Sequence, residues 1–147
     1  MIKVYTIGFT GKSAREFFEL LKGKDIEKLV DIRLSNTSQL AGFTKKADLE
    51  YFVNEICGIE YKHDLNFAPE KYTLDRYRKG EIDWERYTKE FAATMYERRI
   101  KDYMRESYAA EQIICLLCSE PTPECCHRRL IAEYFEQVFE GMEIIHL

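Results

Sequence analysis

Residues 112–139 read QIICLLCSEPTPECCHRRLIAEYFEQVF, and this stretch decides the fold that we expect. Its first seven residues are the most hydrophobic run of the chain and predict a buried strand. A polar loop stiffened by Pro121 and Pro123 follows. The next apolar residues recur at helical spacing: Leu130, Ile131, Tyr134, Phe135, Val138 and Phe139. A buried strand followed by an amphipathic helix is typical of an α/β domain with parallel strands.

The same alternation continues in both directions along the chain. Further strands are predicted over residues 3–7, 28–32, 59–62 and 142–146. Helices are predicted after Ser13, over residues 49–58, and as one long helix from Asp83 to about Tyr108. We interpret residues 64–82 as a long polar loop of the kind that forms lids or binding elements. The prediction is an α/β fold in which a mostly parallel sheet of about five strands carries helices on both faces.

Length and composition bound the domain organisation. The chain has 147 residues, 46% of them hydrophobic, and only three prolines. This is the size of one ordinary domain, and the apolar content is sufficient for a packed core. We therefore expect residues 1–147 to form a single domain.

Net charge and cysteine content indicate the kind of partner and the cellular compartment that we expect. The net charge of -4 gives no overall attraction to nucleic-acid phosphates. Five cysteines, an odd number, do not resemble a secreted disulfide framework, so a reducing cytoplasm is expected. No apolar run approaches the ~20 residues that cross a bilayer, so neither a membrane span nor a signal peptide is predicted. The sequence does not fix the oligomeric state.

The residues that could bind a ligand or take part in chemistry lie where the predicted strands end. Gly8 follows the first strand, Asp31 and Arg33 end the second, and Ser119 and Glu120 follow the hydrophobic strand that ends at Cys118. Parallel sheets bind ligands outside the carboxyl ends of their strands. We therefore expect a ligand site there, with Gly8, Asp31, Arg33, Ser119 and Arg128 as its binding residues.

The helix that begins near Cys126 suggests two kinds of chemistry. Free N–H groups and a partial positive charge at a helix start, together with Arg128, predict an anion site. A cysteine placed there can be held as a thiolate, which makes Cys118 or Cys126 a candidate nucleophile. His127 would move protons and Glu120 would orient it. The first hypothesis is thus a thiolate enzyme acting on a small anionic ligand, such as a nucleotide or phosphorylated metabolite.

Other interpretations of the same residues remain open. The site can belong to a non-catalytic module that binds a nucleotide or a nucleic-acid end, or the Glu120, His127 and Arg128 groups can form a purely structural clasp. Asp31 and Arg33 can pair with each other or with Arg128. The basic and aromatic stretch at residues 71–79 favours a solvated loop over a single-strand binder.

No cofactor or metal is predicted, although zinc is an alternative. Cys118, Cys125, Cys126 and His127 offer soft ligands. Cys115 and Cys118, however, stand three apart on a strand and therefore face opposite sides, which argues against a Cys-x-x-Cys pair. Cys115 and the distant Cys57 are expected to be core residues.

Four short motifs in this order resemble the DUF488 family almost from end to end. The chain carries Tyr5-Thr6-Ile7-Gly8, then Asp31-Ile32-Arg33 followed by Ser35 and Ser38, then residues 77–84 (YRKGEIDW), and finally Leu117-Cys118-Ser119-Glu120 leading to Cys126-His127-Arg128. Phe9 and Leu34-Ser35-Asn36 depart from the family pattern. The resemblance implies a small α/β domain of undetermined biochemical role.

Overall fold

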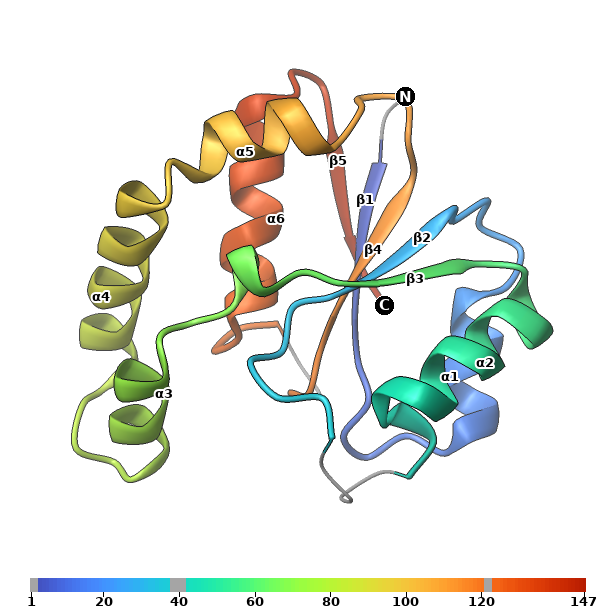
Figure 1. Cartoon of the computed structure of the whole chain (residues 1–147), viewed down its shortest axis with the longest axis horizontal. Helices are drawn as coiled ribbons and strands as arrows, with labels where there is room; N and C mark the ends of the chain where they lie inside the picture. The colour runs from blue at the N-terminus through green and yellow to red at the C-terminus, as the bar shows by residue number, and fades with distance from the viewer. Residues whose placement is uncertain (1–2, 38–41, 121–122) are drawn as a thin grey trace.

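The computed structural model describes residues 3–37, 42–120 and 123–147 and contains one sheet of five parallel strands (Figure 1). The strands lie in the order β3-β2-β4-β1-β5. Their bounds are β1 Lys3–Gly8, β2 Lys28–Asp31, β3 Glu60–His63, β4 Ile114–Cys118 and β5 Glu143–His146. The predicted α/β class, the parallel pairing and the five strands are confirmed. Ser38 and Pro121 lie outside the described residues.

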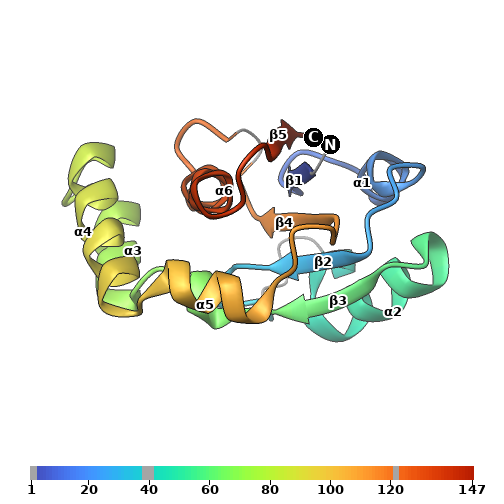
Figure 2. The same cartoon turned by 90° about the horizontal axis from the view of Figure 1, so that it is seen from above.

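Helices cover both faces of this sheet (Figure 2). Those of the described residues are α1 Ala14–Leu21, α2 Lys46–Cys57, α3 Lys71–Arg78, α4 Trp84–Glu97, α5 Ile100–Ser107 and α6 His127–Val138, with short 3-10 turns η1 Gly42–Thr44 and η2 Leu65–Phe67. Figure 2 shows α1 and α2 on one face and α6, α5 and α4 on the other. Within the described residues, no helix has both the length and the apolar character needed to cross a membrane.

The strand order explains which helix lies on which face. The chain moves from β1 past β4 to β2 and β3, and then returns to β4 and β5. Since crossovers between parallel strands are almost always right-handed, a reversal of direction places the later helices on the opposite face. The loop after β4 therefore leads to one face, while the loops after its neighbours β1 and β2 lead to the other. Such a reversal opens a crevice at the carboxyl ends of the strands.

Two hydrophobic clusters follow from the alternation of side chains along the strands. Leu116 and Cys118 of β4 face the cluster under α4, α5 and α6, whereas Cys115 and Leu117 face the cluster under α1 and α2. Successive side chains of a strand point to opposite faces, so this is the arrangement expected for a strand buried on both sides. The prediction that Cys115 and Cys118 lie on opposite sides of the sheet is confirmed.

Residues 64–82 are not the irregular loop that the sequence predicts. They contain η2 and the eight-residue helix α3. The helix was missed because it is strongly polar, and of its residues only Thr73 is buried. Its Tyr77 nevertheless packs against Tyr87 of α4, with ring centroids 4.9 Å apart. Helix formation here depends on a tertiary contact rather than on an amphipathic pattern.

The predicted long helix from Asp83 to Tyr108 is two helices. Tyr87, Phe91 and Met95 recur every four residues along the buried side of α4, but the next buried residue is Ile100. At about 100° per residue, Ile100 would point away from Met95 in a continuous helix. Arg99 adopts a left-handed conformation with φ of 53° and breaks the helix there. The break returns Ile100 to the same cluster as Met95.

Candidate functional site

Cys118 lies at the crevice that the strand reversal creates. It is the last residue of β4 and pairs in register with Gly8, the last residue of β1. The side chain of Cys118 is buried, at 4% exposure, on the α6 side of the sheet. The helix α6 begins at His127, and its first residue contacts the end of this strand.

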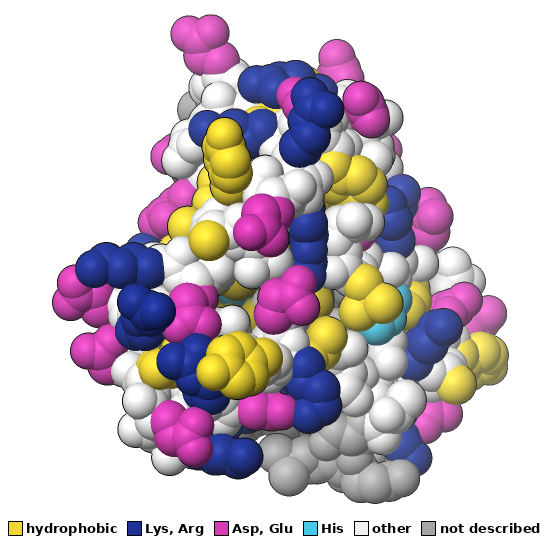
Figure 3. All heavy atoms as spheres, turned by 60° about the vertical axis from the view of Figure 1, so that its left-hand side comes forward, with side chains coloured by type: hydrophobic (Ala, Val, Ile, Leu, Met, Phe, Trp, Pro, Cys, Tyr) yellow, Lys and Arg dark blue, Asp and Glu magenta, His cyan; other side chains and the backbone are white. Residues whose placement is uncertain are grey.

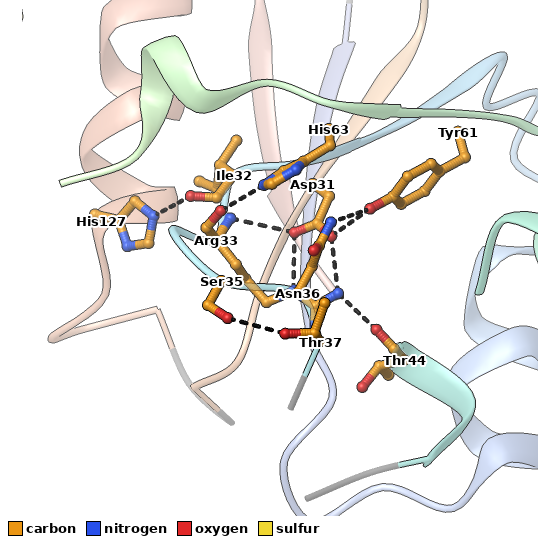
Figure 4. Close-up of polar contacts among 10 residues, drawn as sticks. All are labelled: Asp31, Ile32, Arg33, Ser35, Asn36, Thr37, Thr44, Tyr61, His63 and His127. Atoms are coloured by element: carbon orange, nitrogen blue, oxygen red, sulfur yellow. Dashed lines mark hydrogen bonds and ion pairs between the residues drawn. The ribbon is translucent and has the colours of Figure 1, made fainter. Parts of the chain in front are cut away.

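His127 contacts the Cys118 sulfur with one ring nitrogen and a backbone carbonyl group with the other. The Nδ1 atom of His127 lies 3.6 Å from Cys118 Sγ. Its Nε2 lies 2.8 Å from the carbonyl oxygen of Ile32, a contact that Figure 4 shows. Because a carbonyl oxygen only accepts, Nε2 must carry a hydrogen, and Nδ1 is the atom that exchanges a proton with Cys118. The ring also packs beside Phe91, with centroids 5.8 Å apart. This fixed ring makes Cys118 and His127 a thiol–imidazole pair.

Cys126 completes the cluster and shares one proton with Cys118. A hydrogen bond from the Cys126 thiol is the main reason that the pKa of Cys118 lies well below its usual range, and the charge and hydrogen bond of His127 add to it against burial. Burial, followed by the hydrogen bond and charge of Cys118, raises the pKa of Cys126. Burial opposes the charged form of His127, but the Cys118 thiolate more than offsets it and raises the His127 pKa. Of the two cysteines, Cys118 is thus the one whose surroundings favour the thiolate.

Arg128 places a buried positive charge behind this pair. Its side chain is fully buried, and its Nη1 donates to the Glu120 carbonyl oxygen at 2.5 Å and lies 3.9 Å from Cys126 Sγ. Within the described chain, Nε and Nη2 have no hydrogen-bond partner, and no carboxylate pairs with the guanidinium. Burial and then the Arg128 charge lower the pKa values of Lys12 and His146. The region around Arg128 is therefore electropositive.

Asp31 and Arg33 pair with each other rather than with Arg128. Arg33 donates from Nε and Nη2 to the Asp31 carboxylate at 2.9 and 2.8 Å (Figure 4). Tyr61 donates to the same carboxylate at 2.6 Å, and Arg33 Nη2 also donates to the Thr44 carbonyl oxygen. The Arg33 guanidinium lies 5.2 Å from the centroid of the Phe9 ring. Asp31 thus holds the Arg33 side chain, and Arg33 is also one of the residues that line the cavity of the site.

A cavity of about 480 Å³ opens beside the cysteine pair. This volume lies within the range of about 300–1,000 Å³ that small-molecule sites occupy. Its lining includes the reactive groups Cys118, Cys126 and His127, the aromatic rings of Phe9, Tyr77, Trp84 and Tyr87, the cations Arg33, Lys71 and Arg78, and the carboxylates Asp75 and Glu120. The cavity therefore brings together Cys118 and Cys126, a wall of aromatic rings and basic side chains.

The wall and the surface around it differ in character. Trp84 and Tyr87 stack with centroids 5.1 Å apart, which offers a flat apolar surface inside the cavity. On the outside, the face that Figure 3 shows carries basic and acidic side chains interspersed, with hydrophobic ones between them. An even mixture of charge attracts an extended phosphate backbone only weakly. The basic groups that matter are those within the cavity, where Arg78 has no ion pair among the described residues.

The cluster also has the composition of a soft metal site. The donor atoms of Cys118, Cys126 and His127 lie within 4.8 Å of one another, and all three residues are buried. Two thiolates and an imidazole can hold zinc and leave a fourth position open. Cys125, which the sequence also suggests as a ligand, is exposed and outside this group. A metal ion and the shared proton would compete for the same lone pairs.

The structure brings together most of the residues predicted for the site. Cys118, Cys126, Ser119 and Arg33 line the cavity together with His127 and Glu120. Arg128 and Gly8 are not among the residues that line the cavity. They lie beside the Glu120 backbone, where a Cβ atom on Gly8 would be 1.7 Å from the Glu120 carbonyl oxygen. The Ile32 carbonyl orients His127, a role that the sequence assigns to Glu120.

Sequence reasoning missed two parts of the site. The Ile32 carbonyl carries no signal in the sequence, because every residue has one. The aromatic wall was interpreted differently, since Trp84 and Tyr87 fit a core stripe of a helix and Tyr77 fell in the predicted loop. The mixed basic and aromatic character of residues 71–79 was the available signal, and α3 does place five of these residues on the cavity: Lys71, Leu74, Asp75, Tyr77 and Arg78.

Fold and site together define an α/β protein with a cysteine–histidine cluster at the carboxyl edge of a parallel sheet. The family model described as "Domain of unknown function DUF488" matches residues 13–135. The chain belongs to the DUF488 family, as its motifs indicated. No curated protein and no solved structure matches the chain.

Proposed function

We propose that this protein is an enzyme in which the Cys118 thiolate attacks a small anionic substrate bound in the cavity. His127 moves protons to and from the reacting atoms through Nδ1. The observation that carries the proposal is the contact of 3.6 Å between Cys118 Sγ and His127 Nδ1 on the lining of that cavity. A nucleophile beside a base that a third group orients is the arrangement that activated thiols require.

The surroundings of Cys118 support a thiolate rather than a thiol. Cys126 donates to its sulfur, His127 contributes a positive charge, and the backbone N–H of Glu120 also stabilises the charged form. These groups together outweigh the cost of burying a charge, so that the pKa of Cys118 falls well below its usual range. A thiolate at neutral pH is the form that acts as a nucleophile.

The cavity wall defines the class of substrate. Trp84, Tyr77 and Phe9 can pack against a flat group, while Arg33 and Arg78 can receive a phosphate or carboxylate. Nucleotides and other phosphorylated metabolites combine these features. The cavity volume of about 480 Å³ accommodates a molecule of that size.

The pH dependence of alkylation tests the thiolate directly. Iodoacetamide is expected to modify Cys118 at a rate that is already at its plateau at about pH 7, where an ordinary cysteine with a pKa of about 8.5 is mostly protonated. In His127→Gln the rate should fall and the plateau should move to higher pH. Peptide mass spectrometry follows Cys118, and the exposed Cys125 reports on reagent quality. The proposal would be contradicted if Cys118 of the wild type reacted only at alkaline pH and if the ultraviolet absorbance of its thiolate appeared only over the same alkaline range.

A matched pair of variants tests the anion site. Arg78 and Lys79 are both exposed at the end of α3, but only Arg78 lines the cavity. Since a charge-assisted hydrogen bond contributes about 1.5–3 kcal/mol, Arg78→Ala should weaken binding of a nucleotide roughly tenfold or more. Lys79→Ala should leave it unchanged. Calorimetric titration with a set of nucleotides and sugar phosphates provides the comparison, and equal effects of the two variants would contradict the assignment of the anion contacts.

A further inference from the structure

We propose that Cys126 is a resolving thiol, so that Cys118 and Cys126 form a reversible disulfide during turnover and the substrate is a small anionic disulfide. The inference rests on the proposed function, because it requires Cys118 as the attacking thiolate. It goes further by naming the bond that is attacked and a second catalytic residue.

The geometry places the two sulfur atoms together and the other cysteines apart. Cys118 Sγ and Cys126 Sγ lie within 4.8 Å of each other, and both side chains are buried. Cys115 faces the opposite side of the sheet, Cys57 ends α2, and Cys125 is exposed. A disulfide requires sulfur atoms about 2.05 Å apart, so a small rotation must close the remaining gap.

Cys126 occupies a position that permits this rotation. It is the N-cap of α6, with an extended backbone (φ -135°, ψ 138°), and its side chain makes no capping hydrogen bond. The thiol is therefore not committed to the helix that it begins. Its sulfur contacts Cys118, the partner in the proposed disulfide, and lies 3.9 Å from Arg128 Nη1.

The buried charges favour a reaction in two stages. Before reaction, the hydrogen bond that Cys126 donates favours the negative charge on Cys118. Once Cys118 is part of a mixed disulfide, it carries no charge, and Arg128, whose Nη1 lies 3.9 Å from Cys126 Sγ, faces Cys126 as a buried cation. The helix N-terminus adds to this field. The same surroundings that activate Cys118 first then stabilise a thiolate on Cys126.

The atoms and electrons balance as thiol–disulfide exchange. The Cys118 thiolate attacks one sulfur of R–S–S–R, which forms a Cys118–S–R bond and releases R–S⁻. Cys126 then loses its proton and attacks Cys118 Sγ, which forms the Cys118–Cys126 disulfide and releases the second R–S⁻; one of the two products takes the proton, through His127. The substrate disulfide gains two electrons and the cysteine pair loses them. An external dithiol reduces the pair for the next turnover.

The cavity selects among disulfides by charge and shape. Its aromatic wall, formed by Tyr77 and Trp84, suits a flat substituent, and Arg78 suits a carboxylate or phosphate on it. The probe of choice is therefore 5,5′-dithiobis(2-nitrobenzoate), which is aromatic and dianionic and releases a coloured thiolate. The uncharged 4,4′-dithiodipyridine is its control.

The decisive experiment counts the thiolate released per molecule of probe consumed. The parent protein carries Cys57→Ser and Cys125→Ser, which remove the half-buried and exposed thiols outside the pair. We expect the reduced parent to release both halves of each probe molecule and to end with a Cys118–Cys126 disulfide in non-reducing peptide maps. Adding Cys126→Ser, or Cys126→Ala if the serine variant does not fold, should release one half and leave the other bound to Cys118. Adding Cys118→Ser should abolish the reaction.

The outcomes separate the two proposals. A stable adduct on Cys118 in the parent as well as in the Cys126 variants would overturn the resolving role and leave the thiolate enzyme standing. A parent that forms no bond to Cys118 with either probe would overturn both. A metal ion that appears in the native mass and leaves as the probe reacts would show that the cysteines are ligands and would overturn the resolving role. Arg78→Ala should slow the anionic probe about tenfold and leave the uncharged probe unaffected, whereas Lys79→Ala should alter neither.

Discussion

Replacement of Gly8 by alanine tests how tightly the site is packed. Gly8 ends β1 opposite Cys118, and its φ is not among the positive values that favour glycine. The requirement for glycine is therefore one of space. A Cβ atom at this position would lie 1.7 Å from the Glu120 carbonyl oxygen and 2.6 Å from Arg128 Nη1. Neither atom can yield easily, because one is backbone and the other belongs to a fully buried side chain.

The expected cost follows from these two contacts. Overpacking a buried position typically costs about 1–3 kcal/mol. Moving the Glu120 carbonyl also weakens its hydrogen bond to the Arg128 guanidinium, and a bond to a charged group contributes about 1.5–3 kcal/mol. Gly8→Ala should therefore lower the free energy of unfolding by about 3–5 kcal/mol. For a chain of this length, the melting temperature should fall on the order of 10 °C.

Urea denaturation followed by circular dichroism measures this loss, and Gly42→Ala is the matched control. A Cβ atom on Gly42 meets no other atom within 4 Å, and the φ of Gly42 is not positive. The control should stay within about 0.5 kcal/mol of the wild type. A Gly8→Ala protein that unfolds at the same urea concentration as Gly42→Ala would refute the packing of Gly8, Glu120 and Arg128 described above.

Two further changes test the buried charges around the sheet edge. Arg33→Met should lower the free energy of unfolding by about 3–5 kcal/mol, because it leaves the fully buried Asp31 carboxylate without its ion pair. Urea denaturation of the Asp31→Asn, Arg33→Met double variant tests the pairing, since removal of both charges should recover stability. Tyr108→Phe removes a 2.7 Å hydrogen bond to Asp64 and should cost about 1.5–3 kcal/mol at neutral pH. Burial opposes ionisation of Asp64, but the hydrogen bonds from Tyr103 and Tyr108 outweigh it and lower its pKa. The stabilisation from this hydrogen bond is thus fully present above the Asp64 pKa of the unfolded chain, about 3.9, and is lost as the pH falls through the lower pKa of the folded state. The difference in free energy of unfolding between Tyr108→Phe and wild type should therefore shrink in acid.

The strands and the position of the site could be predicted because both depend on short-range patterns. Continuous apolar runs are typical of strands buried on both faces, and parallel pairing follows from the helices between them. Cys118 ends a strand and His127, nine positions later, starts a helix, which is enough to bring the two side chains to one edge. No knowledge of the tertiary packing is needed for these steps.

The rest depends on contacts between distant elements. The break at Arg99 has no glycine or proline to mark it, and it becomes understandable only when Met95 and Ile100 are seen in one cluster. The choice of Asp31 as partner of Arg33 depends on Tyr61, which a different strand supplies. The burial of Arg128 depends on the space above Gly8. Such facts are properties of the packed molecule, and residue type alone does not contain them.

The arrangement around Arg128 argues against a purely structural clasp. A clasp between strand and helix requires only neutral hydrogen bonds, which contribute about 0.5–1.5 kcal/mol each. This site instead buries a guanidinium with no carboxylate partner in the described residues and leaves two of its nitrogens without hydrogen bonds. An unpaired buried charge is costly. Cys126 Sγ lies 3.9 Å from Arg128 Nη1, so an ionised thiol in the cysteine pair would offset part of this cost. A fold that couples its own stability to a thiolate favours a chemical use of that thiolate over a packing role.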